Sequence, residues 1–346
     1  KHFALCLVGL NQTRNIIHLI LIAFLLDLLI GDPRSLPHPV QFMGVVISFL
    51  RRLAEEFAKE NKTKLYILGA IITIIVVSLS GITGWLIERL FLFFQLKNPI
   101  LSTLFFSLIL SSSLASRSLN KSILEIINSI GKENLSNLRR KLSLIVGRDV
   151  ENLNTNEILR AAAETASENS VDGIFAPLFW IFLGTIFWEF DQSIPGPLAM
   201  AWIFKASSTI DSMLGYKEGK LKWLGFAGAK LDDLMVWIPS RIVLITLPLC
   251  CKTKKSFFKT IKDSWKDGIL DSSPNSGISE AIFAYCAGVR MGGINYYKGQ
   301  KRIKAIIARS YPIASKSSVK KILNISLRLQ LAWILIFCLI MIFINS

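Results

Sequence analysis

The sequence has few of the residues that build common soluble active sites. It contains five cysteines and three histidines, with no C-x-x-C pair and no zinc-type spacing, so we expect neither a zinc site nor a disulfide. It also lacks G-x-x-x-x-G-K-[ST] and G-x-S-x-G. These absences exclude a P-loop nucleotide site and the nucleophile elbow of serine hydrolases.

Charged residues are scarce as well, at 18% of the chain against about 25% in ordinary soluble domains. The apolar residues are instead gathered into runs, several of which approach the roughly 20 residues that a helix needs to cross a bilayer. The sequence therefore predicts an all-α polytopic membrane bundle. We expect one catalytic domain over residues 1–346, in which 116–160 and 252–329 are largely extramembrane helical insertions. The predicted membrane segments are Ile16–Ile30, Tyr66–Ile87, Leu101–Ala115, Gly173–Phe190, Pro195–Met213, Leu234–Cys251 and Leu331–Ile344.

Positive charge dominates what charge there is, with a net charge of +16. No nucleic-acid motif accompanies it, so the positive-inside bias of membrane proteins and attraction to anionic lipid or substrate phosphate explain it better. The distribution of Lys and Arg predicts cytoplasmic loops at 31–66, 116–172 and 205–234. A full crossing by Leu234–Cys251 would then export the basic region 252–330. We therefore expect that segment to bend back or to lie partly buried, helped by Pro239, Arg241 and Pro248.

Acidic residues stand directly beside one of the apolar runs. Glu164, Glu168 and Asp172 recur every four residues, and Asn169 lies among them. On a helix these carboxylates share roughly one face. Carboxylates next to hydrocarbon are costly, and like charges on one face require a counter-ion such as Mg²⁺ or a basic ligand. The segment therefore predicts a charged site.

Three further patches combine charge with glycine or proline. Taken singly, two of them are typical of a helix end, cap or turn, and the patch around Lys205 of an ion pair between Lys205 and a neighbouring carboxylate. Together they supply the acids, amides, hydroxyls and lysines that a site for a magnesium nucleotide uses. The first patch has Asp32 and His38; the second has Lys205, Thr209, Asp211 and Lys217 and continues to Asp232, Asp233 and Arg241; the third has Asn275 and Arg290.

The order of these patches resembles the adenosylcobinamide-phosphate synthase family of cobalamin biosynthesis. The matching strings are GDP…LPHPV, E-x-x-x-E-N-x-x-D-G-x-x-A-P-L-F, K-A-x-x-T-x-D-S-M-x-G-Y-K, L-D-D-L-x-x-x-I-P-x-R and S-P-N-x-G, from about Leu19 to Gly299. Ser208 and Ser279 depart from the expected Asn and Pro. The family consists of integral membrane proteins that join an aminopropanol phosphate arm to a propionate of the corrin ring.

The resemblance implies an amide ligation that depends on ATP and Mg²⁺. Candidate metal ligands are some of the carboxylates Glu164, Glu168, Asp172, Asp211, Asp232 and Asp233. Lys205 and Lys217 would steady the transferred phosphoryl group, and Arg241 and Arg290 the substrate phosphate. His38 is either the general base or a turn residue between two prolines. Asp32, Asn169, Thr209 and Asn275 complete the expected cofactor site, and His38, Glu168, Lys205 and Asp211 the expected catalytic set.

The expected partners are a corrinoid (adenosylcobyric acid), aminopropanol phosphate and the lipid bilayer, with no nucleic acid. The sequence leaves open a homo-oligomer or contacts with other enzymes of the pathway. We expect a multi-pass protein of the cell membrane whose active site faces the cytoplasm. Two other classes compete with the ligase. One is a proton-coupled carrier with a relay through Asp27, Lys205 and Asp211, and the other is a non-catalytic membrane scaffold.

Overall fold

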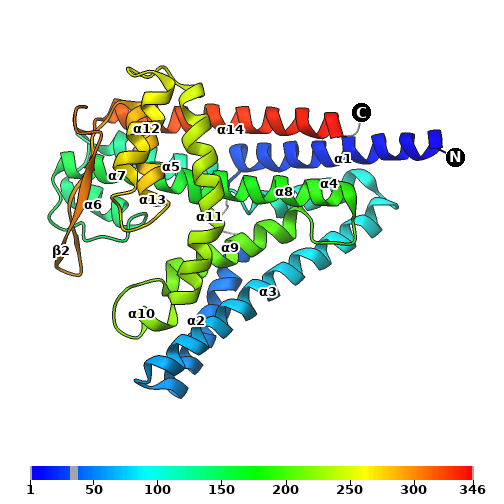
Figure 1. The fold of residues 1–346 in the computed structure, drawn as a ribbon, viewed down its shortest axis with the longest axis horizontal. Coiled ribbons are helices and arrows are strands. Elements are labelled where there is room, and N and C mark those ends of the chain that lie inside the picture. The colour runs from blue at the N-terminus through cyan, green and yellow to red at the C-terminus, as the bar shows by residue number, and fades with distance from the viewer. Residues whose placement is uncertain (1, 32–37, 345–346) are drawn as a thin grey trace. The chain divides into compact units, whose positions relative to one another are not determined.

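A computed structural model describes the backbone of residues 2–31 and 38–344 and the side chains from residue 16 onward (Figure 1). Asp32, one of the predicted cofactor ligands, lies outside the described residues. The chain divides into two compact units, one formed by 1–115, 176–235 and 334–346 and the other by 116–175 and 236–333. Two of the boundaries between them fall inside helices.

In the first unit, the described residues form helices and no strand. Its closest helix pairs are α3 with α9, α8 with α9 and α1 with α4. Its elements are α1 (His2–Leu29), α2 (Pro39–Ala58), α3 (Lys62–Gln95), α4 (Pro99–Ser111), α8 (Ala176–Phe190), α9 (Pro197–Leu214), α10 (Leu221–Leu224), the start of α11 (Phe226–Thr246) and the end of α14 (Lys316–Ile344).

The second unit is helical except for one β-hairpin. The rest of α11 and the start of α14 belong to it. Its other elements are α5 (Ser116–Ser129), α6 (Leu135–Ser143), α7 (Thr155–Ser170), the π-helical turn η1 (Val171–Phe175), the 3₁₀ turn η2 (Leu247–Cys250), α12 (Phe257–Gly268), α13 (Ser276–Ala287), β1 (Met291–Tyr297) and β2 (Gln300–Ile307).

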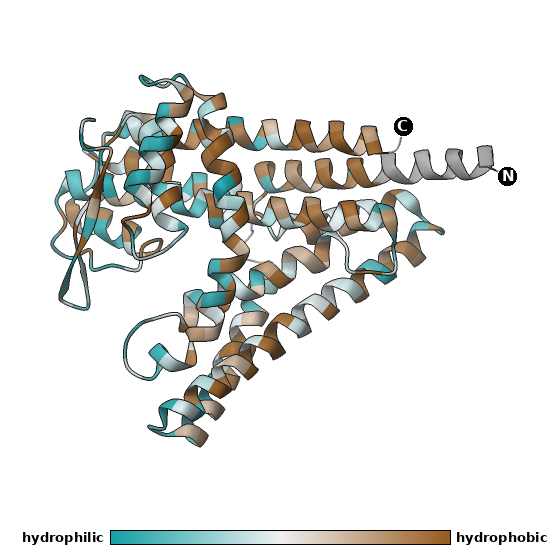
Figure 2. Cartoon of the chain, in the orientation of Figure 1, coloured by the Kyte–Doolittle hydropathy of each residue, from teal (hydrophilic) through white to brown (hydrophobic). Residues whose placement is uncertain are grey.

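The predicted class, an all-α polytopic membrane protein, is confirmed. Among the described residues, four segments are long and apolar enough to cross a bilayer: Lys62–Gln95, Thr155–Phe190, Phe226–Cys250 and Lys316–Ile344. A fifth is possible by composition if α4 and α5, which are bent by 45°, form one span. Figure 2 shows hydrophobic residues concentrated along the C-terminal half of α14, whereas α12 is largely hydrophilic in colour. The predicted segment at 195–213 forms α9, which is not among these candidates.

The segment expected to bend back at Pro239 does not do so. Pro239 lies inside α11, which is helical from Phe226 to Thr246 and leads into η2. A proline removes one backbone hydrogen bond from a helix, and that loss is tolerated where neighbouring groups compensate. Beside it, the Ser240 hydroxyl donates a hydrogen bond to the Val236 carbonyl at 2.8 Å. The prediction of a bend at Pro239 was therefore wrong, whereas its alternative, a partly buried segment, agrees with a candidate span that is partly buried within the structure.

A buried acid in α3 fixes the start of α9. The predicted apolar run ended at Ile87, but the helix continues through Glu88, which is fully buried. The Glu88 carboxylate accepts hydrogen bonds from the backbone N–H groups of Gly196 (2.9 Å), Leu198 (2.8 Å) and Ala199 (3.0 Å). The first N–H groups of a helix have no partner within it and carry positive partial charge. Glu88 therefore caps α9 from a distant helix.

Glu88→Gln is expected to lower the free energy of unfolding by about 1–3 kcal/mol, because the neutral amide offers one acceptor oxygen in place of two charged ones. The apparent melting temperature in detergent would measure the loss. The exposed Glu56 of α2 provides the control, because Glu56→Gln makes the same chemical change in the same unit without removing a cap. Equal melting of both variants and the parent would contradict the capping role.

The β-hairpin was not predicted from the sequence. Strands β1 and β2 are antiparallel and are joined by Lys298 and Gly299, whose φ angles of 50° and 77° are those of a tight two-residue turn. The carboxylate of Asp149 accepts hydrogen bonds from both turn N–H groups, at 2.9 and 2.7 Å. Lys-Gly is a weak turn signal, and the stabilising acid comes from a distant segment. The hairpin places Asn295 and Lys304 in the second unit's polar cavity.

Candidate functional site

Helix α7 carries the most acidic of the predicted motifs. It begins at a capping box, in which the Asn154 side chain accepts from the Glu157 N–H and the Glu157 side chain accepts from the Asn154 N–H. Its small residues pack closely, and Ala161, Ala162 and Ala163 are fully buried. A rigid, buried helix therefore presents Glu164 and Glu168 one turn apart.

Both glutamates line a polar cavity of about 230 Å³ in the second unit. The sequence correctly predicted that they share one helix face. The cavity receives side chains from α7, α13, both strands of the hairpin and the loop before α7. It is lined by Ile145, Val146, Gly147, Arg148, Glu164, Thr165, Glu168, Asn169, Glu280, Asn295, Tyr297 and Lys304.

Glu164 is committed to partners within the protein. Its Oε2 lies 2.7 Å from the Nη1 of Arg148, and both side chains are almost fully buried. Its Oε1 accepts a hydrogen bond from the Gly292 N–H at 2.8 Å. Arg160 donates to the carbonyls of Gly292 and Ile294 at 2.7 and 2.8 Å. Glu164 thus ties α7 to the glycine bulge of β1, and its role as a metal ligand stays a prediction.

Glu168 and Asn169 are placed differently. Among the described residues, neither side chain has a hydrogen bond or ion pair, although both line the cavity. The charges of Lys304, Asp271 and Arg148 all act on Glu168. A carboxylate in a cavity without a direct partner is energetically unfavourable and is available to a cation or a donor from outside. These two side chains are the chemically available groups of this site.

Glu280 and Lys304 form the opposite wall. The Nζ of Lys304 lies 2.7 Å from Glu280 Oε1 and 3.2 Å from Asp271. Glu280 is 1% exposed, and its Oε2 has no hydrogen-bond partner in the described structure. Burial raises the pKa of Glu280 to about 8, and Lys304 only partly offsets this. Burial also lowers the pKa of Lys304, but Glu280, Glu168 and Asp271 outweigh it and hold that pKa above its ordinary value. Lys304 is therefore charged near neutral pH, while burial favours the protonated form of Glu280 more than in water.

This pKa predicts a pH dependence of stability. The folded pKa of Glu280 lies above its ordinary value of 4.5, so folding favours the protonated form. The resulting stabilisation is complete below the ordinary pKa and is lost as the pH rises through about 8. We expect Glu280→Gln to flatten the fall in melting temperature across that range, while Glu125→Gln, at an exposed site of the same unit, leaves it unchanged. Equal slopes for both variants would contradict this assignment.

Asp172, the third acid of the motif, does not line the cavity. It lies in η1, where the backbone winds as a π-helix from Val171 to Phe175. The wider π turn interrupts the 3.6-residue period on which the prediction of one common face depended. Asp172 therefore does not join Glu164 and Glu168 in this cavity, and its role as a metal ligand stays a prediction.

Two other predicted residues, Arg241 and Asn275, meet at the N-terminal end of α13. The Arg241 guanidinium donates to the Asn275 side chain and, at 2.8 Å, to the Pro274 carbonyl. It lies between the rings of Trp237 and Trp265, at 4.8 and 5.7 Å from their centroids. The motifs I-P-x-R and S-P-N are thus joined by the hydrogen bonds of Arg241 to Asn275 and Pro274. Arg290 is exposed and is not in the polar cavity, and the binding roles of all three residues stay predictions.

The first unit holds the remaining predicted residues. The Nδ1 of His38 accepts a hydrogen bond from the Val40 N–H at 3.3 Å and so caps α2. The Thr209 hydroxyl donates to the Lys205 carbonyl at 2.6 Å within α9. The turn residue interpretation of His38 therefore has direct support, and its role as a base stays a prediction.

An acidic group lies where α9 approaches α11. Gly228 of α11 allows this approach, because a Cβ there would lie 2.3 Å from Ile210. Burial and the Asp233 carboxylate raise the pKa of Asp211, and Lys217 opposes them. Lys230 lies 3.7 Å from Asp233. Glu168 belongs to the second unit, whereas Lys205, Asp211 and Asp232 belong to the first, so their convergence into one site stays a prediction.

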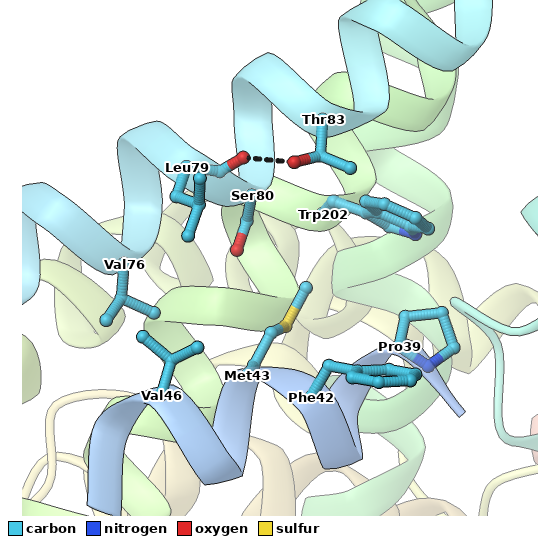
Figure 3. A pocket seen from close by; sticks show the side chains of 9 residues that line it. All are labelled: Pro39, Phe42, Met43, Val46, Val76, Leu79, Ser80, Thr83 and Trp202. Atoms are coloured by element: carbon cyan, nitrogen blue, oxygen red, sulfur yellow. Dashed lines mark hydrogen bonds between the residues drawn. The ribbon is translucent and has the colours of Figure 1, made fainter. Parts of the chain in front are cut away.

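The cavity nearest His38 is apolar. It measures about 260 Å³ and lies between α2, α3 and α9 (Figure 3). The only side-chain hydrogen bond drawn there runs from Thr83 to the Leu79 carbonyl, at 2.7 Å. The indole N–H of Trp202 has no partner among the described residues. This lining suits an apolar group and carries no cationic side chain for a phosphate. It consists of Pro39, Phe42, Met43, Val46, Val76, Leu79, Ser80, Thr83 and Trp202.

Sequence reasoning missed the basic half of the polar cavity. Arg148, Glu280, Asn295 and Lys304 were not among the predicted site residues. No local spacing links them to Glu168, because hairpin pairing and the loop before α7 bring them there. Within residues 16–31 and 38–344, no three His, Cys, Asp or Glu side chains gather closely enough to hold a metal ion by themselves.

Comparison with known proteins assigns this arrangement to a family. The CobD/Cbib protein family matches residues 20–326, which include both units' motifs. The chain belongs to the CobD/Cbib protein family. A cobalamin biosynthesis protein CobD from Synechocystis sp. is 37% identical over 284 residues, covering 82% of this chain and 79% of the relative.

Two further relatives of the family extend the match. The cobalamin biosynthesis protein CobD of Clostridium acetobutylicum is 35% identical over 328 residues, which is 94% of this chain and 99% of the relative. The cobalamin biosynthesis protein CbiB of Salmonella typhi is 35% identical over 285 residues, which is 81% and 83% of the two chains. No solved structure matches the chain. The suspected family membership is therefore confirmed.

Proposed function

We propose that this protein is the amide-forming ligase of cobalamin biosynthesis. It joins (R)-1-aminopropan-2-ol phosphate, or aminopropanol, to a propionate of adenosylcobyric acid and yields adenosylcobinamide phosphate. ATP and Mg²⁺ are its expected cosubstrate and cofactor, and its site faces the cytoplasm, where nucleotide is available. The names of the relatives, cobalamin biosynthesis proteins, support the pathway.

The single observation that carries the proposal is the open pair Glu168 and Asn169 in the polar cavity. The cavity combines acidic groups with the cations Arg148 and Lys304. Such a lining suits a small ligand that carries both an ammonium and a phosphate, because carboxylates bind the first and guanidinium or ammonium groups the second. Carboxylate and amide oxygens are also the ligands that Mg²⁺ takes in proteins, so Glu168 and Asn169 fit that ion as well.

Each residue of the cavity then has a chemical task. When bound, Mg²⁺ and ATP would supply the activation that a carboxylate needs before it can acylate an amine. Arg148 and Lys304 balance phosphate charge, and Glu168 orients the cation or the ammonium. The attacking amine must lose a proton. Glu280 exchanges protons close to neutral pH, because its pKa is about 8. In the first unit, Lys205, Asp211, Asp232 and Asp233 remain proposed ligands of the magnesium nucleotide.

The proposal is tested with purified protein in detergent or lipid. Cobyric acid, aminopropanol phosphate, MgATP and protein are incubated, and the corrinoid is analysed by mass spectrometry. The expected product has gained one amide-linked arm, and its formation stops when ATP or Mg²⁺ is left out. Solute uptake into vesicles without ATP, and no corrinoid product, would favour the carrier instead.

A further inference from the structure

Helix α12 has one face buried against the protein and another face without a partner. Its small residues Thr260, Ser264 and Gly268 are buried. Gly268 packs against α13 so closely that a Cβ there would lie 2.8 Å from the Gly277 carbonyl oxygen. This stripe of small residues explains how α12 docks on α13. It also fixes which face of α12 points outward.

The outward face is apolar along its centre. Phe258 is 80% exposed, Trp265 is 42% exposed and Ile269, just past the helix end, is 55% exposed. At 3.6 residues per turn these three side chains fall within roughly 40° of the helix circumference. Large exposed apolar side chains in one line are unfavourable in water. Lys262, Lys266 and Lys259 are exposed along one edge of this line.

Apart from Lys255, the lysines of this region have no acidic partners in the described part of the chain. Lys252, Lys254, Lys259, Lys262 and Lys266 make no ion pair. Both acids of α12 face inward: Asp263 pairs with Lys255, and Asp267 accepts hydrogen bonds from the Tyr285 hydroxyl and the Ala308 N–H. The outer surface therefore carries uncompensated positive charge beside an apolar line, as interfacial amphipathic helices do.

The position of α12 in the chain brings it near a membrane surface. The candidate span Phe226–Cys250 ends six residues before α12 begins, so the helix starts within about 25 Å of the end of that span. At the end of that span, Leu249 is 71% exposed. A chain leaving the hydrocarbon there meets the headgroup region first, where aromatic rings and lysines are both favourable.

We propose that α12 lies on the bilayer as an interfacial helix that binds anionic lipid headgroups. Phe258, Trp265 and Ile269 enter the boundary between headgroups and acyl chains, and Lys259, Lys262 and Lys266 contact the headgroup phosphates. This face of α12 contacts the same membrane that the protein spans. It is separate from the polar cavity and does not depend on the ligation reaction.

The full-length protein with Phe258→p-benzoylphenylalanine, in nanodiscs of phosphatidylcholine containing a minority of phosphatidylglycerol, tests this directly. After irradiation, mass spectrometry identifies the adduct. The expected adduct is lipid, with phosphatidylglycerol enriched roughly threefold over its share of the bilayer. The same photoreactive residue at Ile303, which is 77% exposed on β2, is expected to give no lipid adduct.

Charge reversal on α12 provides a second test of the proposal. The double change Lys262→Glu and Lys266→Glu is expected to remove the phosphatidylglycerol enrichment. The matched change Lys132→Glu and Lys301→Glu, at exposed lysines of the same unit, is expected to leave it intact. Unchanged melting in pure phosphatidylcholine confirms that each variant is folded. Adducts to another protein, no lipid adduct at position 258, or enrichment that survives the α12 reversal would each overturn the proposal.

Discussion

Glu168→Gln is expected to reduce amide ligation by roughly a hundredfold or more, the range in which removal of a positioned ionisable group usually falls. The substitution keeps the shape of the side chain and removes only its charge. Because Glu168 has no hydrogen bond or ion pair among the described residues, the change breaks no contact inside the protein. Corrinoid product in membranes, followed by mass spectrometry, measures the effect.

The stability of the same variant separates a chemical role from a structural one. An uncompensated carboxylate in a cavity costs folding free energy, so the melting temperature of Glu168→Gln is expected to be no lower than that of the parent. Glu125→Gln, an exposed acid of α5, is the matched control for activity. Full ligation by Glu168→Gln would discard the polar cavity as the site. A large fall in its melting temperature would show instead that Glu168 is structural.

Arg148→Met is expected to destabilise the second unit by about 3–5 kcal/mol, because it leaves the buried Glu164 without its closest cation. Arg148 and Glu164 are 2.7 Å apart, and their side chains are 6% and 5% exposed. The loss corresponds to a fall of roughly 10 °C in the apparent melting temperature. Arg140→Met, at an exposed arginine of α6, changes the same charge without breaking a buried pair.

A double-mutant cycle tests whether the pair acts as a unit. Glu164→Gln alone is expected to destabilise the protein as well, because Arg148 then loses its carboxylate. The double variant is expected to be clearly more stable than the sum of the two single losses, since neither ion is left buried by itself. Additive losses would mean that Glu164 and Arg148 are stabilised by other partners, such as Arg160 and Asn295.

Local periodicity was sufficient for part of this site. Glu164 and Glu168 are four residues apart on a regular helix, so the spacing alone predicted that both would face one cavity. Four residues later, Asp172 does not line the cavity, and the backbone becomes π-helical at Val171. A change in helix type depends on how neighbouring elements pack, and the sequence pattern carries no clear sign of it.

Charge was the less reliable guide. The basic region 252–329 was interpreted as a helical insertion, yet it contains the hairpin that supplies Lys304 to the cavity. The alternation of apolar and polar residues along the hairpin strands is weak, and the turn at Lys298 and Gly299 depends on Asp149. The expected bend at Pro239 was likewise inferred from loop charge, whereas α11 passes through that proline as one helix.

The sequence by itself determined the membrane class, the family and the helix that presents Glu164 and Glu168, because hydrophobic run length and i, i+4 spacing are local properties. Only the tertiary structure decided what each of these acids does. Glu164 is neutralised by Arg148 and anchored to Gly292, whereas Glu168 is left open to the cavity. The two acids look alike in the sequence. They differ because a hairpin and a loop from distant parts of the chain bring their cations and N–H groups to only one of them.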